Sequence, residues 1–104
     1  MADGHISPWF PEQDRVRLAV LGKLIEELNE MSARAARCII HGLDETDPDT
    51  GRLNRDELAR EAADVKACLH VLGIAADVEA DGDRVMSKVG GFGRWHQLIK
   101  EAHP

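Results

Sequence analysis

The stretch LIEELNE, residues 24–30, combines apolar residues at helical spacing with three glutamates in five positions. The stretch LAREAAD, residues 58–64, repeats this combination later in the chain. Both contain a leucine, an acid three residues later and a second acid after three more: Leu24, Glu27 and Glu30, then Leu58, Glu61 and Asp64. Two acid pairs in one register predict two amphipathic helices whose acids share a role.

Helical periodicity extends outward from the first stretch and predicts a helix from about Pro11 to about His41. Pro11 suits a first helical position, because the amide hydrogen that proline lacks has no partner there anyway. Gly42 suits the C-terminal end, because glycine readily adopts positive φ. The predicted apolar stripe consists of Val20, Leu21, Leu24, Leu28, Met31, Ala35 and Cys38.

Residues 43–53 have acids, a proline and a glycine but no periodicity, and we expect them to form a solvated loop. A second helix is predicted after this loop. Asn54 is a candidate N-cap, and Glu57 three residues later would complete a capping box. Gly73 is expected to end this helix. Its predicted stripe consists of Leu58, Ala62, Val65, Leu69 and Leu72.

The rest of the chain predicts one or two shorter helices. Residues 75–89 are expected to form one helix, with a break near residues 81–83. Three glycines at positions 90, 91 and 93 predict a turn, and residues 94–102 a short final helix. Residues 1–10 are a lead-in without a helical pattern.

The two long helices are expected to run antiparallel, because a short loop joins them. A helix turns about 100° per residue, so both acid pairs lie on the same flank of their apolar stripes. Antiparallel packing then brings all four acids to one side of the seam. The predicted fold is all-α, an antiparallel helical hairpin plus one or two shorter helices. Such a hairpin buries little area, so we expect oligomerisation to complete the bundle.

Four converging carboxylates repel one another, and partial burial removes the water that would screen them. A cation would offset this repulsion, and oxygen ligands suit Mg²⁺ or Mn²⁺. The predicted metal ligands are Glu27, Glu30, Glu61 and Asp64. The alternative is that the acids form solvated helix faces, paired with basic neighbours such as Lys23 and Arg34.

Composition narrows the class of protein. The chain has 104 residues, of which 43% are hydrophobic and 4% aromatic, which predicts one small folded domain rich in helix. A net charge of −6 argues against nucleic acid as a partner.

Cys38 and Cys68 are far apart and are expected to be reduced apolar residues. No apolar run has membrane-spanning length and no signal peptide is evident, so we expect a cytoplasmic protein without a membrane partner.

Residues 26–30 read E-E-x-x-E and residues 61–64 read E-x-x-D, each within a predicted helix. This pair of motifs resembles the MazG-type all-α nucleoside triphosphate pyrophosphohydrolases over about residues 16–72. The resemblance implies one MazG-like domain over residues 1–104, in a homodimer or homotetramer whose sites are formed partly by a neighbouring chain. It implies cleavage of a (d)NTP between the α- and β-phosphates, giving a nucleoside monophosphate and pyrophosphate.

The resemblance also implies residue roles. Glu27, Glu30, Glu61 and Asp64 would bind Mg²⁺, and Glu26 and Glu27 would be the catalytic residues, with Glu26 orienting the attacking water. Two other functions stay open: a non-catalytic relative that binds nucleotide or a protein partner, and a purely structural helical module.

Contacts to the nucleoside triphosphate need cations for phosphate and an aromatic face for the base. Lys23 and Arg34 lie on the same predicted helix flank as the first acid pair, and Lys88 and Arg94 bracket the expected glycine turn. The aromatic residues available for base stacking are Trp9, Phe92 and Trp95, of which Trp9 and Trp95 are the predicted ligands. The alternative roles are ordinary surface cations and, for Trp95, a core position next to Leu98 and Ile99.

Overall fold

The computed structural model describes residues 10–103, which form three helices and no strand. The helices are α1 (Arg15–His41), α2 (Asn54–Ala76) and α3 (Gly82–Ala102). The all-α prediction is therefore confirmed. None of these helices combines the length and the apolar character that crossing a membrane requires.

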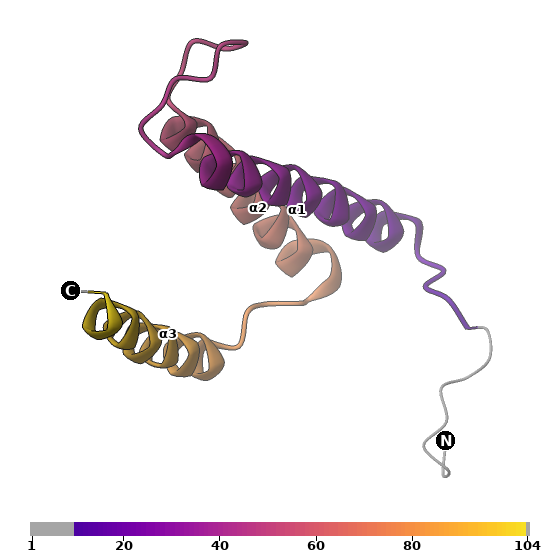
Figure 1. Ribbon diagram of the computed structural model, residues 1–104. Coiled ribbons are helices and arrows are strands. Elements are labelled where there is room, and N and C mark those ends of the chain that lie inside the picture. The colour runs from indigo at the N-terminus through magenta and orange to yellow at the C-terminus, as the bar shows by residue number, and fades with distance from the viewer. Residues whose placement is uncertain (1–9, 104) are drawn as a thin grey trace.

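Helices α1 and α2 pack side by side as a hairpin (Figure 1). Arg34, late in α1, pairs with Glu57 in the first turn of α2. Val20, early in α1, lines the same recess as Val71 near the end of α2. These contacts show that the two helices run antiparallel, as predicted.

The first helix begins later than predicted, at Arg15. The side chain of Asp14 caps it by accepting a hydrogen bond from the Arg17 amide, at 2.9 Å. An N-cap side chain satisfies one of the first amides of a helix, which would otherwise have no partner, and therefore marks the helix start. Pro11 precedes this cap and lies outside the helix. The predicted C-terminal end is confirmed, since Gly42 has a φ of 90° and its amide donates to the Cys38 carbonyl at 2.9 Å.

The predicted capping box of the second helix is wrong. Leu53 occupies the N-cap position of α2 and makes no side-chain cap. Asn54 instead donates from its side-chain amide to the Gly42 carbonyl at 3.0 Å, which ties the start of α2 to the end of α1. Gly73 does not end α2 either, because the helix continues to Ala76 and ends at Asp77 in the left-handed region.

The C-terminal region is one helix where a break, a turn and a second helix were predicted. The expected break is the N-cap of α3, where Asp81 accepts from the Arg84 amide at 3.1 Å. Gly90, Gly91 and Gly93 lie inside the helix. Glycine lowers helix stability by roughly 1 kcal/mol per residue without forbidding the helical conformation. Three glycines therefore do not by themselves require a turn, and the turn prediction is wrong.

The hairpin has a small apolar core. Leu72 is the one buried hydrophobic side chain among the described residues, whereas Glu27, Arg34 and Glu57 are buried polar ones at the helix seam. The predicted stripe of α1 is partly wrong, because Leu21 and Leu28 are exposed. The face that meets α2 is turned by about 40° around the helix axis from the predicted stripe. It consists of Val20, Leu24, Glu27, Met31, Arg34 and Cys38.

Helix α3 packs against neither α1 nor α2 (Figure 1). No Cα atom of α3 lies within 8 Å of a Cα atom in either helix. Residues 77–81 connect α2 to α3 without helical structure. The described chain is therefore a hairpin with a separate third helix.

Candidate carboxylate site

The acids of the two helices converge at the seam of the hairpin. Glu26, Glu27 and Glu30 of α1 each offer a carboxylate oxygen within 4.8 Å of the others. Glu27 also belongs to a second group with Glu61 and Asp64 of α2, again within 4.8 Å. The structure thus brings together the five acids that the sequence singled out, with Glu27 common to both groups.

Burial leaves two of these carboxylates incompletely satisfied. Glu27 is only 8% exposed, because it lies in the face that meets α2 rather than at the predicted edge of the stripe. The Oε2 atoms of Glu27 and Glu61 are buried without a hydrogen-bond partner among the described residues. Such an oxygen costs free energy unless a donor or cation reaches it. The donor set and its unpaired oxygens therefore fit a divalent cation that prefers oxygen ligands.

Mutual repulsion is evident at Glu30. The pKa of its carboxyl is raised, chiefly by the negative charge of Glu27, then by desolvation and by the charge of Glu61. A raised pKa means that the ionised form is disfavoured in this position. A cation would reverse the effect by stabilising the ionised carboxylates.

Lys23 is the predicted phosphate-binding residue that lies at the cluster. Its ammonium is 3.4 Å from Glu26 Oε2 and 3.5 Å from Glu27 Oε1. The pKa of Lys23 is raised, first by the charge of Glu26 and further by that of Glu27. Lys23 reaches Glu27 through Oε1, so the buried Oε2 atom is left without a partner within residues 10–103.

Arg34 has a different setting from the one predicted for a substrate ligand. It is buried, with Nη1 at 2.6 Å from Asp47 Oδ2 and Nη2 at 3.5 Å from Glu57 Oε2. Glu57 also forms an ion pair with Arg52. The pKa of Asp47 is lowered by its hydrogen bond from Arg34, and that of Glu57 by its hydrogen bond from Arg52. This buried network joins the loop to both helices.

Sequence reasoning missed this network, although part of its signal was present. Arg34 follows Glu27 by seven residues, about two helical turns, which places both on one face of α1. Asp47 carried no such signal, because a loop has no periodicity that would indicate which acid is buried. The prediction of a solvated loop is wrong for Asp47, which is 5% exposed.

The other predicted substrate ligands are not brought to the cluster within one described chain. Lys88, Arg94 and Trp95 belong to α3, which contacts neither helix of the hairpin. Trp95 is exposed and does not occupy a core position in the described chain. Trp9 lies outside the described residues.

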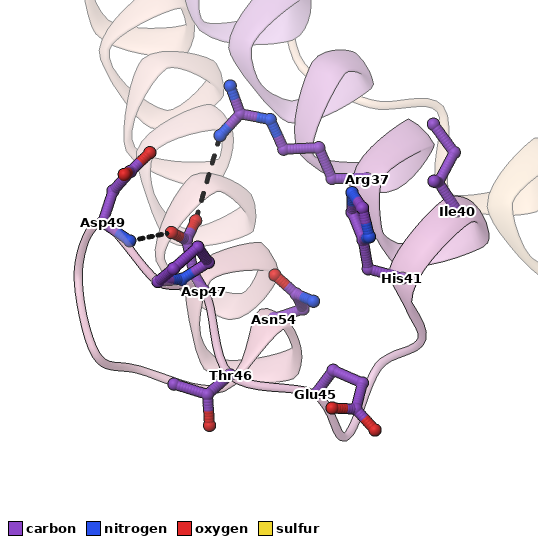
Figure 2. A pocket seen from close by; sticks show the side chains of 9 residues that line it. Arg37, Ile40, His41, Glu45, Thr46, Asp47, Asp49 and Asn54 are labelled. Atoms are coloured by element: carbon purple, nitrogen blue, oxygen red, sulfur yellow. Dashed lines mark hydrogen bonds and ion pairs between the residues drawn. The ribbon is translucent and has the colours of Figure 1, made fainter.

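A hollow of about 580 Å³ lies at the loop end of the hairpin (Figure 2). Figure 2 shows Arg37 extending toward Asp47, with 3.9 Å between Nη1 and Oδ2. Asp47 also accepts from the Asp49 amide at 2.8 Å. The buried acid of this hollow is therefore satisfied by the protein itself, unlike Glu27 and Glu61 in the carboxylate cluster.

An apolar recess of about 270 Å³ adjoins the carboxylate cluster. It lies about one helical turn from the cluster, because Lys23 precedes Glu27 by four residues and Cys68 follows Asp64 by four. The recess is lined by Ala19, Val20, Lys23, Ala67, Cys68 and Val71. A ligand with an anionic end and an apolar end would find complementary chemistry along this side of the hairpin, once a cation offsets the acids.

Cys38 and Cys68 are free thiols within the described residues. Cys38 lies within 3.7 Å of the Asn54 carbonyl oxygen and Cys68 lines the apolar recess. Comparison of the whole chain with protein-family models, with curated proteins and with solved structures gives no match.

Proposed function

We propose that this protein is a Mg²⁺-dependent nucleoside triphosphate pyrophosphohydrolase that produces a nucleoside monophosphate and pyrophosphate. The observation that carries the proposal is the convergence of five acids from two helices, with two buried oxygens that have no partner in the described part of the chain. The resemblance of the two acidic motifs to the MazG-type enzymes supplies the reaction. The adjoining apolar recess offers a place for the less polar part of a nucleotide.

The proposed metal ligands are Glu27, Glu30, Glu61 and Asp64. Bound Mg²⁺, or Mn²⁺ in its place, would neutralise polyphosphate charge and lower the pKa of the attacking water. Without such neutralisation, a polyphosphate would be repelled by these acids.

The remaining roles belong to the exposed part of the cluster. Glu26 is exposed beside Glu27 and would orient the attacking water through its carboxylate. Lys23 contacts Glu26 and Glu27 and would hold both in position while offering its ammonium to a phosphate oxygen. Water positioning and charge stabilisation are the main tasks of a protein in phosphoryl transfer.

A second candidate is a non-catalytic relative that binds nucleotide or a protein partner. One observation favours it: Lys23 is the one predicted phosphate ligand at the cluster, because Arg34 is held by Asp47 and α3 lies apart. A site with few cations for phosphate would still bind a metal ion and a nucleotide, yet stabilise a transition state poorly.

Product analysis tests the activity directly. We expect a panel of common and modified (d)NTPs with Mg²⁺ to yield monophosphate and pyrophosphate without diphosphate, and EDTA to abolish turnover. Glu27→Ala and Glu61→Ala should remove turnover while preserving helicity measured by circular dichroism. Glu45→Ala is the matched control, because Glu45 is an exposed acid of the loop outside both carboxylate groups. Unchanged rates in both cluster variants would refute the site assignment.

Binding measurements separate the two candidates. Titration calorimetry with Mn²⁺ should show binding to the parent protein and to Glu45→Ala, and weaker binding to Glu61→Ala. Absent turnover, together with a nucleotide-dependent rise in melting temperature, would favour the non-catalytic candidate. Absent binding of both metal and nucleotide would reject both.

A further inference from the structure

Helix α3 has an apolar stripe that nothing in the described chain covers. The members of this α3 stripe are Val85, Val89, Phe92 and Ile99. At about 100° per residue, these four side chains fall within an arc of about 80° on one side of the helix. All four are exposed, from 41% at Ile99 to 60% at Val89.

The hairpin has a second uncovered apolar surface on the side opposite the carboxylates. Leu28 is 46% exposed and lies about 100° from Glu27 and about 160° from Glu30 around α1. On α2, Leu69 is turned from the seam in the same sense, and antiparallel packing therefore places it on the same side as Leu28. The hairpin face consists of Leu21, Ile25, Leu28 and Ile39 from α1 and Leu69 from α2.

Helix α3 needs a packing partner to be stable. It has 21 residues, and three of them are interior glycines that each lower helix stability by roughly 1 kcal/mol. The glycines divide α3 so that its longest stretch without one is residues 94–102. Isolated helices shorter than about 12–15 residues are marginal even with favourable sequences, and protein helices gain most of their stability from packing an apolar face. A described chain with one buried hydrophobic residue, Leu72, lacks that packing.

We propose that two copies of this chain assemble with the α3 stripe of each copy seated on the hairpin face of the other. The described fold keeps α3 away from its own hairpin, and pairing of the two hairpin faces alone would leave both copies of α3 uncovered. In a twofold-symmetric pair, the α3 stripe of each copy covers the hairpin face of the other, so the same contact occurs twice. Both stripes and both hairpin faces are then covered.

Length and charge both fit this arrangement. The 21 residues of α3 span about 31 Å, and the hairpin face extends about 27 Å from Leu21 to Ile39. Helix α3 has four basic and two acidic residues, a net charge of +2, whereas the whole chain has a net charge of −6. A basic helix on an otherwise acidic partner lowers the repulsion between two like chains. The proposal depends on burial and charge and not on the proposed enzymatic activity.

Sedimentation equilibrium tests the assembly and the stripe. We expect the mass of two chains for the parent protein. Val89→Asp should raise the dimer dissociation constant at least roughly tenfold, because it places a charge in an apolar contact. Leu98→Asp is the matched control, since Leu98 is nine residues along and therefore on the opposite side of α3, with 63% exposure against 60% for Val89. A monomeric parent protein, or equal losses in both variants, would overturn the proposal.

Disulfide mapping identifies the contacting faces without depending on a destabilised variant. In a background with Cys38→Ser and Cys68→Ser, Leu28→Cys and Phe92→Cys chains are prepared separately and mixed under mild oxidation. The proposal predicts a crosslinked pair that contains one chain of each kind. Crosslinking of Leu28→Cys chains to each other would indicate face-to-face pairing and overturn it. A chain with both substitutions that closes on itself at monomer mass would also overturn it, by placing α3 on its own hairpin.

Discussion

At the scale of single residues, Glu30 links the stability of the fold to pH and to metal. Its raised pKa means that the fold disfavours its ionised form, so the unfavourable contribution is present above the folded-state pKa and disappears as the pH falls through it. We therefore expect the metal-free melting temperature to rise as the pH is lowered from neutral toward the carboxyl range. Thermal unfolding followed by circular dichroism over this range measures the effect.

Two other acids set the lower limit of that rise. The pKa values of Asp47 and Glu57 are lowered, so their stabilising contribution is present above the unfolded-state pKa and is lost as the pH falls through the folded-state value. The melting temperature should therefore pass through a maximum. Glu30→Gln should remove the rise on the neutral side, and saturating Mg²⁺ should remove it in the parent protein. A rise of the same size in Glu30→Gln would show that another group is responsible.

Arg34 provides a second residue-scale prediction. Replacing it with methionine leaves Asp47 buried without its main partner, whereas Glu57 keeps its ion pair with Arg52. We expect Arg34→Met to lower the free energy of unfolding by roughly 3 kcal/mol. Urea denaturation at neutral pH and fixed protein concentration measures this change.

The control for Arg34 is an ion pair with similar geometry on the surface. Arg55 Nη2 lies 2.9 Å from Asp44 Oδ1, but both side chains are mostly exposed. Arg55→Met should therefore change the free energy of unfolding by less than about 1 kcal/mol. Equal losses for the two variants would mean that burial does not distinguish the pairs.

At the scale of elements, a glycine inside α1 and the glycine at its C-cap should respond oppositely to the same substitution. A Cβ added at Gly22, within the helix, would meet nothing within 4 Å, so Gly22→Ala should raise the free energy of unfolding by roughly 0.5–1 kcal/mol. Gly42 has a φ of 90°, which a residue with a side chain rarely adopts, so Gly42→Ala should lower it. Melting temperatures at one protein concentration compare the two. A lower melting temperature for Gly22→Ala would show that this position is not open.

The elements also show how far the sequence could predict the fold. The hairpin, its antiparallel sense and the end of α1 at Gly42 follow from periodicity and a short loop, and the structure confirms them. The rotation of α1 does not follow, because its apolar residues span two adjacent faces. The observed rotation of α1 buries Arg34 against Asp47 and Glu57. The same rotation places Glu27 inside the seam. That choice depends on an ion pair between distant segments, which no local pattern contains.

The same reasoning explains the outcome for the site. The acids could be placed together because they share a register within two helices, which is a local property. The prediction of a substrate role for Lys88 and Arg94 depends on a glycine turn between them, but those glycines lie within a continuous helix that contacts neither helix carrying the acids. Proximity to glycines in sequence therefore did not indicate a position in space.

At the scale of the whole molecule, the small apolar core predicts that folding and assembly occur together. Within residues 10–103, one buried hydrophobic side chain and a third helix that contacts neither α1 nor α2 leave little to stabilise a separate monomer. When folding requires association, dilution favours the unfolded chain by mass action. The melting temperature should therefore rise over a roughly hundredfold increase in protein concentration. A chain that is stable alone would melt at one temperature throughout.

The stripe variants make this prediction specific. Leu98→Asp should retain the dependence of melting temperature on concentration, because its side chain lies on the side of α3 away from the stripe. Val89→Asp should melt at a lower temperature at every concentration, and its melting temperature should rise in parallel with that of the parent protein, because the lost contact lowers the free energy of assembly by the same amount at each concentration. If Val89→Asp and the parent protein melt alike and independently of concentration, α3 contributes no packing to the stable fold, and its helicity must then come from local interactions that three interior glycines oppose.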